Sequence, residues 1–140
     1  MDTITNYTIK SELGQGGMAT VYLAEDKKFL TNVAVKVLAK EFAHNENIRK
    51  RFLAEARNMF KMSHPNIIKV SDLIDEGDTV AFVMEYIEGE TLKDYLERKG
   101  KLNDEEIKFD YYFLVLKFII QHFFVEIMNL VGGSNICIVF

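Results

Sequence analysis

The sequence predicts an α+β domain in which a five-stranded antiparallel sheet carries one packed helix. Five segments are rich in β-branched and aromatic residues, as strands are, and short turn-forming stretches separate most of them. A single amphipathic segment of helical periodicity lies between the third and the fourth strand. Because 49% of the 140 residues are apolar, the chain can form one domain with a core.

The first three strands are expected at residues 7–13, 20–24 and 33–38. Glycines interrupt the pattern between the first two strands, and the polar residues 26–32 connect the second strand to the third. Short connections of this kind join antiparallel neighbours, so we expect hairpins and a twisted sheet.

A helix is predicted for the segment that follows, because its apolar residues recur at spacings of three and four. Charged residues occupy the other faces of this helix. The segment ends at His64-Pro65-Asn66, since proline cannot continue a helix and biases the residue before it toward extended geometry. The apolar stripe consists of Ile48, Phe52, Ala56, Met59 and Phe60.

Two further strands are expected at residues 67–73 and 79–86, joined by a turn of acidic residues and glycine. Beyond them, Thr91 opens a short helix that Gly100 ends, and Asn103 opens another helix.

Charge and cysteine content narrow the classes of function. A net charge of −4 argues against a nucleic-acid-binding protein, which is expected to carry a basic surface. Cys137 is the single cysteine, so the chain has no internal disulfide, which fits a reducing compartment. Residues 1–10 contain no basic stretch followed by an apolar run and do not resemble a signal peptide. We therefore expect a cytoplasmic protein.

The glycine-rich residues 13–21 are the first feature that points to chemistry. Glycines let backbone amides approach phosphate oxygens with no side chain in the way, although a glycine-rich segment is often only a turn. A dinucleotide-binding loop would need a helix directly after the glycines. Residues 20–24 have the pattern of a strand instead, so a hairpin that covers a ligand is the better interpretation.

Two charged residues occur where they could complete such a site. Lys36 lies in a β-branched strand, from which its ammonium could hold phosphate oxygens, although a lone strand lysine more often faces solvent. Glu55 lies on the helix beside the apolar stripe and could pair with Lys36. Taken alone, Glu55 is better explained by a pair within the helix with Arg51, four residues earlier.

In combination, these features resemble the eukaryotic-like protein kinase family, and bacterial serine/threonine kinases in particular. Gly14, Gly16 and Val21 match the family pattern G-x-G-x-x-G-x-V, in which Ala19 replaces the third glycine. The resemblance covers residues 7–108. It implies the fold of a kinase amino-terminal lobe and ATP-dependent phosphoryl transfer to serine or threonine of proteins.

The resemblance also implies roles for individual residues. Lys36 corresponds to the family's strand lysine, which contacts the α- and β-phosphates, and Glu55 to the helix glutamate that pairs with it. Met84 would be the gatekeeper beside the adenine, and backbone groups of Glu85 and Ile87 would bind the adenine edge. Leu13, Val21 and Ala34 would sandwich the adenine ring between apolar surfaces. The full set of ATP-binding residues that the resemblance implies is Leu13, Gly14, Gln15, Gly16, Gly17, Val21, Ala34, Lys36, Glu55, Met84, Glu85 and Ile87.

The motifs that carry out phosphoryl transfer in the family do not occur in this sequence. No histidine is followed by Arg-Asp, and Asp-Phe-Gly is absent, so neither a catalytic base nor a magnesium-binding aspartate is recognised. We expect a family member that uses ATP and Mg²⁺ but lacks the metal ligands in this chain, and that is inactive as an isolated chain. The alternative is a nucleotide-binding or partner-docking module without kinase activity.

Three parts are distinguished along the chain. Residues 1–90 are interpreted as the ATP-binding lobe, 91–108 as a helix after the hinge and the start of a second-lobe helix, and 109–140 as an apolar tail. The abrupt change of composition at Phe109 is interpreted as a truncated gene or a shifted reading frame, which would stop the family pattern before the catalytic loop.

The apolar tail is predicted to form one long helix of about five turns that ends at its two consecutive glycines. This helix would pack on the lobe, bind a protein partner or contact a membrane. A membrane crossing needs about 20 apolar residues with few charges. Lys117, His122 and Glu126 interrupt the tail, so membrane contact is the less favoured interpretation.

Overall fold

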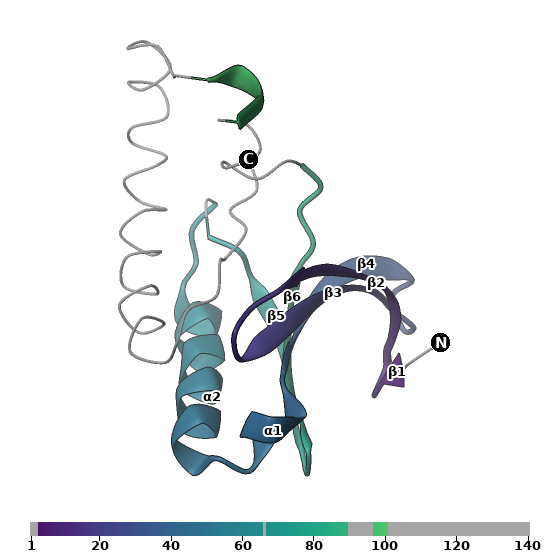
Figure 1. Ribbon diagram of the computed structural model, residues 1–140. Coiled ribbons are helices and arrows are strands. Elements are labelled where there is room, and N and C mark those ends of the chain that lie inside the picture. The colour runs from purple at the N-terminus through teal and green to yellow at the C-terminus, as the bar shows by residue number, and fades with distance from the viewer. Residues whose placement is uncertain (1–2, 66, 90–96, 101–140) are drawn as a thin grey trace.

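A computed structural model describes residues 3–65, 67–89 and 97–100 of the chain, which fold into a curled antiparallel sheet with helices along one side (Figure 1). The strands lie in the order β1-β2-β3-β4-β6-β5, and all neighbours are antiparallel. The strands are β1 (Thr3–Ile4), β2 (Tyr7–Gln15), β3 (Ala19–Asp26), β4 (Thr31–Leu38), β5 (Val70–Glu76) and β6 (Thr79–Glu85), and the helices are α1 (Lys40–Ala43) and α2 (Glu46–Lys61).

The α+β class is confirmed, but the sheet has six strands instead of the predicted five, and within the described residues a short helix, α1, precedes the predicted packed helix α2. β1 and α1 are two and four residues long, too short to leave a periodic pattern in the sequence. β5 begins at Val70 instead of residue 67 and continues to Glu76, so the turn to β6 consists of Gly77 and Asp78. Gly77 has φ +56°, a left-handed conformation that glycine adopts without strain.

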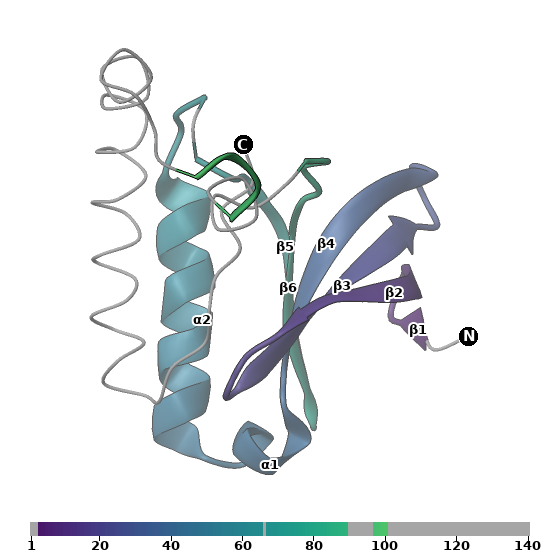
Figure 2. The same ribbon diagram turned by 45° about the horizontal axis from the view of Figure 1, so that its top comes forward.

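The two faces of the sheet are buried in different ways. Helix α2 covers one face, while β1 and β2 curve away from α2 and enclose the other (Figures 1 and 2). The α2 side buries Met18, Ala19, Leu38, Phe52, Leu53, Ala56, Val70, Val80 and Phe82. The inside of the curl buries Tyr7, Ala24, Val35, Ile74, Ala81 and Val83.

A hydrogen bond between β2 and β5 closes the curl of the sheet. The Tyr7 hydroxyl donates to Asp72 Oδ2 at 2.8 Å, although the two strands are not neighbours in the sheet. Burial, and then the Asp72 carboxylate, raise the pKa of the Tyr7 hydroxyl above its ordinary value. The hydroxyl therefore remains a donor, and the bond holds the two strands together.

Most of the predicted apolar stripe of α2 faces the sheet, but its last residue does not. Phe52 and Ala56 are buried, and Ile48 and Met59 pack against the same cluster. Phe60 is 67% exposed, so its assignment to the buried stripe is wrong. It lies one residue before the end of α2, where the described part of the chain does not cover the helix.

The amino-terminal end of α2 is capped by Asn45, which the sequence analysis missed. Its side-chain Oδ1 accepts hydrogen bonds from the backbone N–H groups of Asn47 and Ile48, at 3.1 and 3.2 Å. These two N–H groups have no partner within the helix, so the cap stabilises the first turn.

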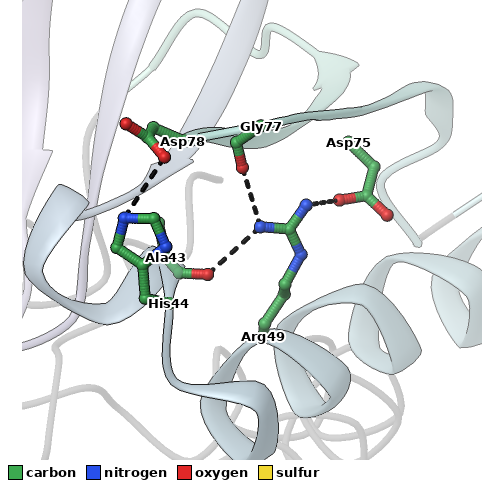
Figure 3. Close-up of polar contacts among 6 residues, drawn as sticks. All are labelled: Ala43, His44, Arg49, Asp75, Gly77 and Asp78. Atoms are coloured by element: carbon green, nitrogen blue, oxygen red, sulfur yellow. Dashed lines mark hydrogen bonds and ion pairs between the residues drawn. The ribbon is translucent and has the colours of Figure 1, made fainter.

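Arg49, in the first turn of α2, links this helix to two other parts of the domain (Figure 3). Its Nη1 donates to the carbonyl oxygens of Ala43 at 3.1 Å and Gly77 at 2.8 Å. Its Nη2 forms an ion pair with the Asp75 carboxylate. One guanidinium thus connects α2, the end of α1 and the β5–β6 hairpin.

We expect Arg49→Met to lower the free energy of unfolding by about 1–2 kcal/mol, because two carbonyls and a carboxylate lose a shared donor. Arg57→Met, on the exposed side of the same helix, is the matched control and should change it by less than about 0.5 kcal/mol. Urea denaturation followed by far-UV circular dichroism measures both. Equal effects would show that the Arg49 contacts do not stabilise the fold.

Three predictions concern residues that the structure does not describe: the helix start at Thr91, the helix from Asn103 and the long helix of the apolar tail. Residues 97–99 are helical, and Gly100 follows them with φ +84°, as expected for a glycine that ends a helix. Among the described residues, none of the helices has the length and apolar character needed to span a bilayer.

Candidate functional site

The register of the sheet places candidate residues from three strands in one row. Gly14 of β2 lies opposite Val21 of β3, Val21 opposite Lys36 of β4, and Lys36 opposite Phe82 of β6. Side chains directly opposite each other on neighbouring strands point to the same face. The Phe82 ring contacts Phe52 of α2, so this row lies on the α2 side of the sheet.

A second row on the same face carries the other apolar candidates. Ala34 lies opposite Met84, and these residues are two positions away from Lys36 and Phe82 along their strands. Because side chains alternate along a strand, Ala34 and Met84 share the face of Lys36. Val21 belongs to this face as well, so three of the residues expected around an adenine ring lie beside Lys36.

Lys36 and Glu55 form a buried ion pair between the sheet and α2. Lys36 Nζ lies 2.7 Å from Glu55 Oε1, and the two side chains are 8% and 7% exposed. The ammonium also lies 5.8 Å from the ring centroid of Phe52 and 5.5 Å from that of Phe82. The contact predicted from the combined motifs is therefore confirmed. Lys36 does not face solvent, and Glu55 is not limited to a pair within its own helix.

Burial dominates the electrostatics of Glu55. It raises the pKa of the Glu55 carboxyl above the ordinary value of 4.5, and the Lys36 ammonium offsets this only in part. A carboxyl with a raised pKa binds more protons in the folded state than in the unfolded state. Its contribution to stability is therefore complete below pH 4.5 and is lost as the pH rises through the folded-state pKa.

This direction predicts a specific pH dependence. The difference in unfolding free energy between the native chain and Glu55→Gln should decrease as the pH rises from about 4.5 to 7. Urea denaturation at several pH values measures this difference, in which the contributions of unchanged carboxyl groups cancel. Asn58→Ala, which removes no ionisable group from an exposed position of the same helix, should give a nearly constant difference. A Glu55→Gln difference that grows with pH would mean that attraction to Lys36 outweighs burial.

The glycine hairpin, which we define as residues 13–21, joins β2 to β3. Pairing continues to Gln15 opposite Thr20, and the Gly16 N–H donates to the Ala19 carbonyl oxygen at 2.8 Å across the tip. A Cβ built at Gly14 would meet no other atom of the chain within 4 Å. Packing within the chain therefore does not require glycine at position 14.

Met18, at the tip of this hairpin, has a position that the sequence analysis did not foresee. It is 5% exposed and belongs to the cluster buried by α2. Its carbonyl oxygen accepts a hydrogen bond from the Ala39 N–H at 2.8 Å. No sequence signal indicates this, because a residue at the tip of a glycine-rich turn is ordinarily exposed.

The other candidate residues lie at the edges of this arrangement. Leu13 is 41% exposed and lies where the register between β2 and β3 shifts. The Glu85 N–H donates to the Lys69 carbonyl oxygen at 3.0 Å, so this N–H already has a partner within the fold. Ile87 follows the end of β6 and is half-buried. The remaining candidates, both exposed on the hairpin, are Gln15 and Gly17.

No metal site is formed by the described residues. Within them, no group of three or more His, Cys, Asp and Glu side chains lies close enough together to hold an ion. The described residues therefore do not fit a Mg²⁺ site of their own.

Comparison with known proteins identifies the family. The profile of the protein kinase domain matches residues 7–124. The serine/threonine-protein kinase PrkC of Bacillus subtilis is 43% identical over 100 residues, which are 71% of this chain and 15% of that protein. A probable serine/threonine-protein kinase, PknB of Lactococcus lactis, is 43% identical over 105 residues, which are 73% and 17% of the two chains.

Solved structures share the fold. The kinase domain of PknI from Mycobacterium tuberculosis matches with a TM-score of 0.59 and 27% identity, over 73% of this chain and 42% of that domain. The apo form of PpkA-294 matches with a TM-score of 0.61 and 22% identity, over 70% and 41% of the two chains. This chain spans only about 15% of the length of the curated relatives that it matches. The family profile shows that the chain belongs to the protein kinase family, and the relatives named above are described as serine/threonine kinases.

Proposed function

We propose that this chain is the ATP-binding part of a protein serine/threonine kinase, with ATP bound between the glycine hairpin and the Lys36 face of the sheet. The observation that carries this proposal is the buried Lys36–Glu55 pair, whose lysine lies in the same row of the sheet as Gly14. A buried ammonium held by a carboxylate beside a glycine hairpin is suited to bind phosphate oxygens.

The phosphate end of the proposed site depends on three features of the chain. Lys36 would contact phosphate oxygens, and Glu55 would keep its ammonium in place at 2.7 Å. Backbone amides of the hairpin would approach the phosphates, which explains why Gly14 has open space around it although the chain itself does not require a glycine there.

The adenine end would be formed by the same face of the sheet and by the end of β6. Val21, Ala34 and Met84 offer apolar surface beside Lys36. The carbonyl of Glu85 and the backbone of Ile87 would bind the edge of the base. At Glu85 the carbonyl is proposed instead of the N–H, because the N–H already donates to the Lys69 carbonyl oxygen.

We further propose that the isolated chain binds ATP without transferring its phosphoryl group. The sequence contains neither an Asp-Phe-Gly aspartate nor the aspartate that follows His-Arg in the family. ATP supplies the phosphoryl group in this family, and Mg²⁺ neutralises its charge. We also propose a cytoplasmic location for the chain and a protein partner for the apolar tail.

Calorimetric titration with ATP, together with a transfer assay using labelled ATP and a generic protein substrate, tests this function. We expect ATP binding and no label transfer. Gly14→Val should weaken ATP binding by about tenfold or more, which corresponds to about 1.4 kcal/mol. The same substitution should leave the unfolding free energy within about 0.5 kcal/mol of the native value, because the valine side chain enters open space.

Three outcomes would contradict the proposal. A native chain that is folded but binds no ATP would remove the nucleotide-binding function. Equal ATP affinity of Gly14→Val and the native chain would place the nucleotide elsewhere. Label transfer by the isolated chain would show that it is active and that its catalytic groups lie outside the motifs of the family.

A further inference from the structure

The tip of the glycine hairpin is packed into the domain core. Met18 is 5% exposed, and its cluster includes Leu38 of β4 and the α2 residues Phe52, Leu53 and Ala56. The hairpin correspondingly projects from the sheet toward α2 (Figure 2). The buried Met18 side chain thus fixes the tip, although glycines precede it and would otherwise allow it to move.

The backbone of the tip is fixed as well. The Ala39 N–H donates to the Met18 carbonyl oxygen at 2.8 Å, and Ala39 is the residue that precedes α1. The Gly16 N–H donates to the Ala19 carbonyl oxygen across the turn, also at 2.8 Å. The tip is therefore attached at its side chain to the α2 cluster and at its main chain to the connection between β4 and α1.

The cluster that holds Met18 also surrounds the Lys36–Glu55 pair. Phe52 belongs to this cluster, and its ring centroid lies 5.8 Å from Lys36 Nζ. Leu38 of the cluster lies two residues after Lys36 on the same face of β4. Close-packed interiors transmit displacements, because a side chain that moves leaves its neighbours with a void.

We propose that Met18 is a positioning residue that couples the glycine hairpin to helix α2. When the Met18 side chain packs in the cluster, it favours the position of α2 in which Glu55 reaches Lys36. Displacement of the hairpin therefore destabilises this position of α2, and displacement of α2 destabilises the position of the hairpin. The affinity for a ligand beneath the hairpin and the Lys36–Glu55 contact then depend on the same packing of Met18. The statement about the ligand rests on the proposed ATP function, whereas the link from Met18 to Glu55 does not.

Three variants of the whole chain test this coupling. Met18→Ala removes the side chain from the cluster, Met18→Leu keeps a similar apolar volume, and Met62→Ala truncates a methionine that is 39% exposed. The first readout is the carboxyl carbon resonance of Glu55 in the nucleotide-free protein, which reports whether Lys36 is in place. The second is the affinity for ATP, measured at a temperature at which every variant is folded.

We expect Met18→Ala to move the Glu55 resonance and to weaken ATP binding by about fivefold or more. Met18→Leu should restore both properties, and Met62→Ala should behave as the native chain. If Met18→Ala does not fold, Met18→Val, which removes less volume, serves for the same comparison.

The coupling is overturned if a folded Met18→Ala or Met18→Val chain is less stable but keeps the native Glu55 resonance and ATP affinity. Met18 would then be an ordinary core residue. If the native chain binds no ATP, the proposed function fails, and the Glu55 resonance alone decides the role of Met18. A shifted resonance in that case supports the link from the hairpin to α2, and an unchanged one contradicts it.

Discussion

Phe52→Ala is expected to lower the free energy of unfolding by about 3–5 kcal/mol, because it leaves a cavity between α2 and the sheet. Phe52 is 2% exposed, and its ring centroid lies 5.1 Å from that of Phe82, which is 1% exposed. The two rings also flank the Lys36 ammonium. A loss of this size is a large part of the 5–15 kcal/mol that ordinarily stabilises a domain.

Phe60→Ala is the matched control, since it makes the same substitution on the same helix at a residue that is 67% exposed. It should change the unfolding free energy by less than about 0.5 kcal/mol. Because the chain contains no tryptophan, urea denaturation is followed by far-UV circular dichroism. A large effect of Phe60→Ala and a small effect of Phe52→Ala would show that α2 presents a different face to the sheet.

Lys36→Met is expected to lower the unfolding free energy by about 3–5 kcal/mol near neutral pH, because it leaves the Glu55 carboxylate buried without its cation. Glu55 is 7% exposed, so water does not replace the lost partner. The loss should shrink in acid, where the carboxyl takes up a proton. Urea denaturation at neutral and acidic pH measures both effects. ATP binding should fall below detection in the same variant.

The double variant Lys36→Met/Glu55→Leu separates the two roles of this pair. Replacing both charges with apolar side chains removes the unpaired carboxylate, so the stability should return to within about 1 kcal/mol of the native chain. ATP binding should remain lost, because the ammonium is still absent. A double variant that binds ATP as the native chain does would show that Lys36 has only a structural role.

Strands rich in β-branched residues could be predicted from the sequence, whereas short elements and element ends could not. β3 and β4 appear where the β-branched segments indicated, each extended by a few residues through pairing with its neighbours. β1 is too short to have a pattern of its own, and it forms because β2 offers it an edge. Phe60 has the spacing of a buried residue, but its exposure depends on which part of the chain covers the last turn of α2.

The charged pair of the site could be predicted because two motifs supported it together. Neither residue indicated a site when considered alone. Lys36 could have been a solvent-facing strand lysine, and Glu55 could have paired with Arg51 within its helix. Their meeting at 2.7 Å depends on how α2 crosses the sheet, which local sequence does not specify. Met18 could not be predicted, because its burial results from the same crossing and from a bend at the hairpin tip.

An ATP titration followed by amide resonances of the native chain is the most direct measurement of whether the glycine hairpin and Lys36 bind a nucleotide together. We expect shifts at Gly14, Val21, Lys36 and Ile87, and little change at Arg57 on the exposed side of α2. Shifts confined to other surfaces, with the hairpin and Lys36 unchanged, would contradict a nucleotide site formed by these residues.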